Sequence, residues 1–185
     1  MAVVNQKCIR AGNYLDWAPL RRTDPVKPVP PELFVQVGDV LICSTGRGTL
    51  GRAAGVSAVP EDMTVDGHVT IVRADGDSLR GDYLGLVLSE RVREFESLAG
   101  GSTNQTELSP AAIAGVKFPL PPMEEQRRIV DLVGAVDNVI EHHRRLNGLG
   151  GGGELRELRS NLLTALLSGE HEIPASYDEL LEVNA

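Results

Sequence analysis

The stretch GDVLICSTGRGTLGRAAG, Gly38 to Gly55, combines residue types and a spacing found in loops that bind phosphate groups. Gly46, Gly48 and Gly51 form a G-x-G-x-x-G pattern directly after an apolar run. In a dinucleotide site, such a pattern places the pyrophosphate at the N-terminus of the helix that follows. Here the next residues, RAAGVSAVPED, form helices poorly because they include a glycine, β-branched valines and a proline. We therefore expect no nucleotide cofactor.

The same stretch fits a tight hairpin between strands at Val40–Cys43 and about Arg52–Val56. A glycine-rich tip lets a partner approach the backbone closely, and hydroxyls and guanidinium groups are the groups that contact phosphates and guanine edges. A solvated turn with incidental arginines is the other interpretation. The side chains that this hairpin would present at its tip are Ser44, Thr45, Arg47, Thr49 and Arg52.

A second polar segment, GGSTNQTELS at 100–109, is dense in small hydrogen-bonding side chains. Its members could bind bases or phosphates, and the alternative is a loop that caps a helix at Ser109 and Pro110. The candidate ligands in this loop are Ser102, Thr103, Asn104 and Gln105.

The sequence contains no catalytic or metal-binding constellation that we would defend. The metalloprotease H-E-x-x-H, the hydrolase G-x-S-x-G and the Walker loop are all missing from the sequence. Asp75, Asp77 and Asp82 fall in turns and favour a solvated acidic surface over a metal site. The cysteines, Cys8 and Cys43, lack metal-ligand spacing and indicate reduced thiols in a cytoplasmic protein. We expect neither enzyme activity nor a cofactor.

Composition predicts a globular protein, because hydrophobic residues make up 42% of the 185. No apolar run approaches the roughly 20 residues of a membrane span, so we expect no membrane association. The net charge is −8, but the first 60 residues carry seven lysines and arginines against four acidic residues. Because charges are screened beyond about 8–10 Å, an acidic total leaves room for a local basic patch.

The elements that would position these residues predict an α+β fold. Residues 1–120 form short strands and turns, with strand character over 32–45 and at Val69–Arg73. Helical spacing predicts one helix over about 82–98, and a short strand is expected at 116–118.

From Pro121 the pattern changes to a helical region over 121–170, followed by an acidic tail over 171–185. Helices are predicted at 123–146 and 154–168, separated by a run of glycines. They either fold back as a hairpin or each meet a helix of another chain, since their apolar stripes need a partner. The stripe residues are Ile129, Leu132, Val133, Val136, Val139, Ile140, His143, Leu155, Leu158 and Leu162.

The run LAGGSTNQTELSPAAIAGVKFPLPPMEEQRRIVDLV resembles the specificity subunits of type I restriction–modification systems. A polar loop, an apolar segment running into PLPP, and a long helix opened by EEQRRIV carry the resemblance, together with VNQKCIR at 4–10, GDVLICSTGRG at 38–48 and HVTIVRADG.

The resemblance implies a target recognition domain at 1–120 that reads half of a bipartite sequence in double-stranded DNA. It implies that the helices act as a ruler and dock a DNA-adenine methyltransferase subunit, with a restriction (motor) subunit as a further partner. The chain looks like a half subunit that lacks the usual N-terminal strands, so two copies would pair through the helices. For DNA contact it adds Lys7, Arg10, Arg21 and Arg22 to the two polar loops.

Two other interpretations remain open. One is a truncated scaffold that dimerises or holds the methyltransferase without recognising DNA, as the acidic total favours. The other is a recognition domain cut from a fused restriction–methylation enzyme.

Overall fold

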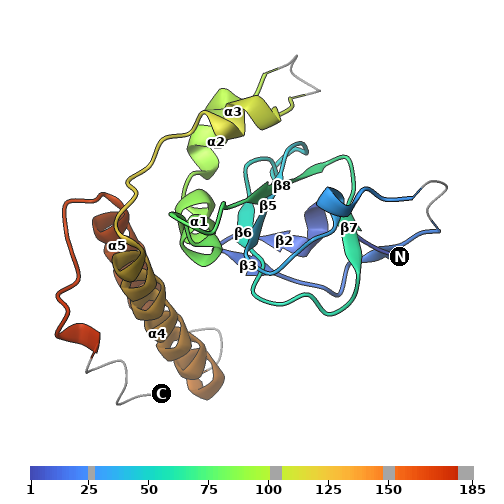
Figure 1. Ribbon diagram of the computed structural model, residues 1–185. Coiled ribbons are helices and arrows are strands. Elements are labelled where there is room, and N and C mark those ends of the chain that lie inside the picture. Colours follow the sequence, from blue (N-terminus) through green and yellow to red (C-terminus); the bar gives the residue numbers. More distant parts are fainter. Residues whose placement is uncertain (25–27, 101–105, 148–152, 179–185) are drawn as a thin grey trace. The chain divides into compact units, whose positions relative to one another are not determined.

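The structure, a computed structural model, describes residues 1–24, 28–100, 106–147 and 153–178 (Figure 1). The chain divides into two compact units, Met1–Lys117 and Phe118–Ala185, which we call unit 1 and unit 2. Unit 1 combines strands in several sheets with short helices, and unit 2 is helical. The α+β class predicted from the sequence is therefore confirmed. The loop residues 102–105 lie outside the described residues.

Unit 1 is built from short strands and short helices joined by turns. Its strands are β1 (Ala2–Val4), β2 (Ile9–Arg10), β3 (Tyr14–Leu15), β4 (Arg21–Arg22), β5 (Asp39–Cys43), β6 (Ala53–Gly55), β7 (Met63–Val65) and β8 (Val69–Arg73). Its helices are η1 (Gln6–Cys8), η2 (Pro31–Leu33), α1 (Gly81–Ser89), α2 (Val92–Leu98) and α3 (Pro110–Ala114).

The central sheet of unit 1 has the order β6-β5-β8, with both neighbours antiparallel to β5. β5 is buried along its whole length, so its sequence DVLIC is nearly continuous in apolar residues. Helix α1 packs on β5 and β6, where Gly85 and Gly55 allow the two backbones to approach each other. A second sheet, β4-β1-β7, and the pair β2-β3 complete unit 1.

The predicted hairpin is confirmed. Val40 faces Gly55, Leu41 faces Ala54 and Ile42 faces Ala53 across β5 and β6. The strand predicted at Val69–Arg73 is also present, as β8.

Three expected elements differ from the structure. The strand character over 32–45 is limited to β5, because Pro30 and Pro31 start η2 and a turn over 36–39 precedes the strand. The helix expected over 82–98 is two helices, since Arg91 leaves the helical region (ψ 21°) and starts α2. Residues 116–118 pair with no described strand. Pro119 and Pro121 follow them and cannot donate ladder hydrogen bonds.

Unit 2 is a helical hairpin of α4 (Met123–Asn147) and α5 (Gly153–Leu167), which pack against each other (Figure 1). Glu124 and Glu125 lie in the first turn of α4, and Arg144 and Arg145 in its last, as the helix dipole favours. Gly169, just past α5, lies against Pro119, just before α4, so the helices are antiparallel. None of the described helices is long and apolar enough to cross a membrane.

The first residues of the predicted acidic tail pack back onto α4. The backbone N–H of Ile173 donates to the Glu125 carboxylate (2.7 Å), and both groups are buried. Asp178 accepts from Arg127 (2.8 Å) and Arg128 (3.0 Å). Arg128 and then Arg127 hold the pKa of the Asp178 carboxyl below its ordinary value. The segment 171–178 is therefore part of unit 2.

Candidate nucleic-acid interface

The loop between β5 and β6, residues 44–52, is held in one conformation by its glycines and by backbone hydrogen bonds. Gly46, Gly48 and Gly51 have φ values of +102°, +77° and +80°, a region that side chains disfavour. The N–H of Leu50 donates to the carbonyl of Gly46 (3.0 Å), and that of Gly51 to Cys43 (2.9 Å). β6 follows the loop directly, so the geometry of a dinucleotide site is excluded.

One side of this loop packs on the protein and the other faces outward. Leu50 is buried, and Gly51 lies so close to Phe95 and Val92 of α2 that a Cβ would contact both. Arg47 and Gly48 are exposed on the opposite side. The loop therefore presents its arginine-bearing tip on a fixed base.

A network of polar side chains joins the loop to η1 and to the turn before β8. Gln6 Nε2 donates to Thr45 Oγ1 (2.9 Å), and Thr49 Oγ1 donates to Gln6 Oε1 (3.0 Å). Thr45 Oγ1 also lies 2.8 Å from His68 Nδ1. This network brings together three segments that are far apart in the sequence.

The hydroxyl residues named from the sequence differ in what they can still contact. Ser44 is buried, its hydroxyl pairs with Thr70, and its backbone bonds to His68 and Leu108. Ser44 thus belongs to the base of the loop, and we remove it from the contact surface. Thr45 and Thr49 are partly exposed but already take part in the Gln6 network.

The basic residues named from the sequence fall into two groups. Arg10, Arg21 and Arg22 are exposed but paired with Asp16 (2.9 Å), Asp66 (3.9 Å) and Glu61 (2.7 Å). Glu61 raises the pKa of the Arg22 guanidinium, and Arg22 in turn lowers the pKa of Glu61. The second group, Lys7, Arg47 and Arg52, forms no ion pair with any described residue.

The two thiols beneath the loop are buried and unpaired. Burial raises the pKa of the Cys43 thiol to about 12 and also raises that of Cys8. Both thiols are therefore protonated and unreactive at neutral pH. Among the described residues, no group of three His, Cys, Asp or Glu side chains could hold a metal ion.

The helical stripe predicted from the sequence is divided by the hairpin. Ile129 and Val133 are buried, whereas Val139 and Leu158 are each more than half exposed. Of the other named residues, Leu132, Val136, Ile140, His143, Leu155 and Leu162 are half-buried. Arg159 of α5 donates to Asp137 of α4 (3.1 Å for one of the two bonds), which links the helices. Leu163 and Leu166, buried on α5, lie next to the named stripe.

Comparison with known proteins identifies the family. Residues 35–149, more than half of the chain, match the family described as the type I restriction modification DNA specificity domain. The chain belongs to this family. The specificity-domain match includes the 44–52 loop, β8 and all of α4. Members of this family are non-catalytic components of their restriction–modification enzymes.

Two relatives are similar to this specificity domain over part of their length. A putative type I restriction enzyme MjaX specificity subunit of Methanocaldococcus jannaschii is 25% identical over 107 residues, which is 56% of this chain and 25% of that protein. The crystal structure of an HsdS subunit from Thermoanaerobacter tengcongensis superposes with a TM-score of 0.59 at 21% identity. That alignment covers 78% of this chain and 37% of the other, and supports the fold. The alignments with this chain span 25% and 37% of the lengths of these two relatives.

Sequence reasoning missed Gln6 and His68 of this specificity domain. Gln6 lies 39 residues before Thr45, and no sequence pattern links the two. A weak signal existed for His68, because pairing Val69 with Cys43 would have placed the preceding residue beside Ser44.

Proposed function

We propose that this chain recognises a specific sequence in double-stranded DNA as the specificity component of a type I restriction–modification system. It would direct an adenine-N6 methyltransferase subunit and a restriction subunit to a bipartite site. The observation that carries this proposal is the family match over residues 35–149, which includes both the loop and the long helix. In this role the chain is not itself an enzyme, needs no cofactor, and works in the cytoplasm.

The loop supports a role in DNA contact. Lys7, Arg47 and Arg52 have no acidic partner among the described residues, so neutralising a phosphate with them breaks no ion pair seen there. The fixed base of the loop lowers the entropy lost on binding. Arg10, Arg21 and Arg22 would have to give up their carboxylate partners, so we rank them below the loop residues.

The helices support a role in assembly. Val139, Leu146 and Leu158 are large apolar side chains left exposed on the hairpin. We propose that these exposed apolar residues dock the methyltransferase subunit or a second copy of the chain. Two copies would provide the two half-site readers that a bipartite target needs.

The test is a methylome. The full chain is expressed with the adenine methyltransferase encoded beside it, in a host that lacks adenine methylation, and the modified bases are sequenced. The proposal expects a bipartite motif, and a palindromic one would mean that two copies act together. Arg47→Ala should weaken DNA binding and reduce the salt dependence, log Kd against log salt, by about one. Absence of any modified motif, with both proteins present and associated, would overturn the proposal.

The alternative function is a scaffold that holds the methyltransferase without recognising DNA. Two observations favour it: the net charge is −8, and three of the candidate arginines are ion-paired. Tight methyltransferase binding without any modification would support it. A recognition domain cut from a fused restriction–methylation enzyme shares the chemistry of the first proposal and would appear as a longer reading frame upstream.

A further inference from the structure

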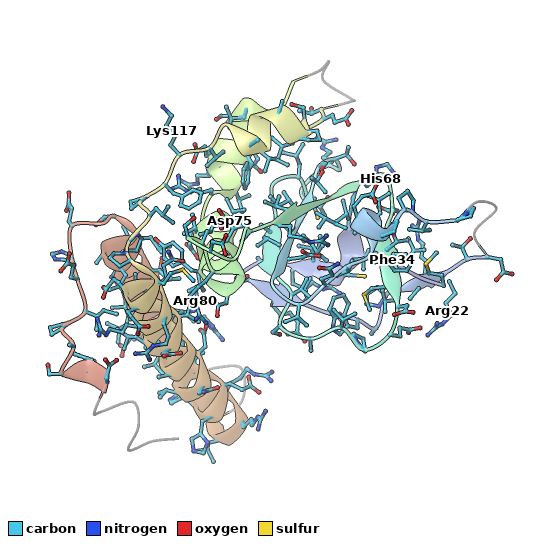
Figure 2. The ribbon with its side chains drawn as sticks, in the orientation of Figure 1. Arg22, Phe34, His68, Asp75, Arg80 and Lys117 are labelled. Atoms are coloured by element: carbon cyan, nitrogen blue, oxygen red, sulfur yellow. The ribbon has the colours of Figure 1, made fainter. Side chains whose placement is uncertain are left out.

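His68 sits at a fixed point beside the 44–52 loop, on the turn between β7 and β8 (Figure 2). Its backbone N–H donates to the Asp66 carboxylate (3.0 Å), and its carbonyl accepts from the N–H of Ser44 (2.9 Å). The backbone of His68 is thus tied on one side to its own turn and on the other to the first residue of the loop. The residue is nevertheless exposed.

The contact with Thr45 engages one nitrogen of the His68 ring, Nδ1, and turns the other, Nε2, away from Thr45. Gln6 Nε2 donates to Thr45 Oγ1, and that hydroxyl lies 2.8 Å from His68 Nδ1. We take the Thr45 hydroxyl as the donor to Nδ1, which is the arrangement in which a neutral imidazole carries its N–H at Nε2. The exposed ring then offers one hydrogen-bond donor at its far nitrogen.

Gln6 is held in this arrangement by a second contact. Its Oε1 accepts from Thr49 Oγ1 (3.0 Å), so the amide is oriented by the loop from both ends. Gly46 leaves room for it, because a Cβ there would overlap the Gln6 side chain. The series of hydrogen bonds Thr49–Gln6–Thr45–His68 thus couples the position of the His68 ring to the conformation of the loop.

We propose that His68 is a DNA-contacting residue, donating its Nε2–H to an acceptor on DNA, and that Gln6 is the residue that positions it through Thr45. This inference rests on the proposed DNA-recognition function, since His68 and Gln6 contact the loop that carries Arg47 and Arg52. The acceptor is either a phosphate oxygen or a base-edge acceptor such as a purine N7, guanine O6 or thymine O4. Loss of a phosphate contact would weaken binding equally on all sequences, whereas loss of a base contact would change the recognised motif at one position.

The histidine can be replaced so that its two nitrogens are tested separately. In His68→Asn the side-chain oxygen can still accept from Thr45, but the donor at the far nitrogen is lost. In His68→Gln the amide nitrogen reaches about as far as Nε2 and restores a donor. The matched control is His171→Asn, at an exposed histidine of unit 2 that has no part in the interface. All variants are made in the full chain, with folding checked by the fluorescence of the single tryptophan, Trp17.

The assay measures binding of the complex with its methyltransferase to DNA carrying the motif found in the methylome. His68→Asn should weaken binding about ten-fold, the effect of one hydrogen bond, and His68→Gln should recover part of it. Because the lost donor is uncharged, the salt dependence should stay unchanged, unlike in Arg47→Ala. Gln6→Leu should also weaken binding, but add nothing in the His68→Asn background. In ¹⁵N spectra, Gln6→Leu alone should lower the population of the Nε2–H form of His68.

The outcomes separate this inference from the proposed function. If wild type modifies a motif and Arg47→Ala weakens binding, while His68→Asn binds as tightly as His171→Asn, the function stands and the role of His68 is refuted. If Gln6→Leu leaves the tautomer of His68 unchanged, the positioning role of Gln6 is refuted. If wild type modifies no motif, both proposals fail together.

Discussion

Replacing Gly46 with alanine should destabilise unit 1 more than the same change at Gly48 of the same loop. Gly46 has a φ of +102°, where a non-glycine residue costs about 1–2 kcal/mol. An added Cβ would also overlap the Thr49 hydroxyl and the Gln6 amide, whose Cδ would lie 2.9 Å away. Gln6 would have to leave its contacts with Thr45 and Thr49, at about 0.5–1.5 kcal/mol each. Gly46→Ala is therefore expected to lower the free energy of unfolding by about 2–5 kcal/mol in total.

Gly48→Ala is the matched control. Gly48 lies two residues away with a φ of +77°, and a Cβ there would meet nothing within 4 Å. Gly48→Ala should therefore lower the free energy of unfolding only by the backbone cost, about 1–2 kcal/mol. The difference between the two variants, about 1–3 kcal/mol, measures the Gln6 network apart from the backbone.

Urea unfolding followed by Trp17 fluorescence suits the assay, because Trp17 packs against the core of unit 1 and is the only tryptophan of the chain. Gln6→Ala adds a second test. It should destabilise the wild type but have little further effect in Gly46→Ala, where the network is already broken. Equal stabilities of Gly46→Ala and Gly48→Ala, or full additivity with Gln6→Ala, would show that the network does not hold the loop.

Two further predictions concern ion pairs. Arg73 donates to the buried Asp39 (2.6 and 2.9 Å) and to the Phe34 carbonyl. Arg73→Met should therefore lower the free energy of unfolding by about 2–4 kcal/mol in the same assay, less than the loss of a fully buried pair because Arg73 is 36% exposed. Adding Asp39→Asn should recover part of that stability, and a further loss would contradict the prediction. The pKa of Asp178 is lowered by Arg128 and Arg127, so its contribution to stability is present above about pH 3.9, the ordinary value, and is lost as pH falls through its folded pKa. An NMR titration should find the Asp178 midpoint below that value in wild type and higher in Arg128→Gln. An unchanged midpoint would show that the ion pair between Asp178 and Arg128 is not formed in solution.

The elements that sequence reasoning found are those in which one local signal decides the structure. The hairpin of β5 and β6 follows from an apolar run, three glycines and a second short strand, and α4 follows from its prolines, its charged ends and its apolar stripe. The break between α1 and α2 was missed because residues on both sides of Glu90 keep the same helical spacing and are buried in the same way, including Leu88 and Phe95. Periodicity reports which face is buried and is insensitive to a short interruption.

The candidate site was harder to predict than the fold because its organisation depends on long-range contacts. The sequence named the loop residues by type, and this was enough to find Thr45 and Thr49. It could not show that Ser44 is buried, nor that Gln6, 39 residues before Thr45 in the sequence, contacts the loop. Similarly, six of the basic residues in the first 52 were named from the sequence as equal candidates, while the structure pairs three of these six with carboxylates.

Under the proposed function, this division of the basic residues sets the salt dependence that we expect of one copy of the chain. Each phosphate neutralised contributes about 0.9 to the slope of log K against log salt, so contacts by Lys7, Arg47 and Arg52 would supply a slope of about −2.7. A protein that makes about 6–10 phosphate contacts has a slope roughly two to three times as steep. A second copy or a partner subunit would add further contacts and make the second binding step intramolecular. The exposed apolar residues of the α4–α5 hairpin, Val139, Leu146 and Leu158, are our candidates for that association.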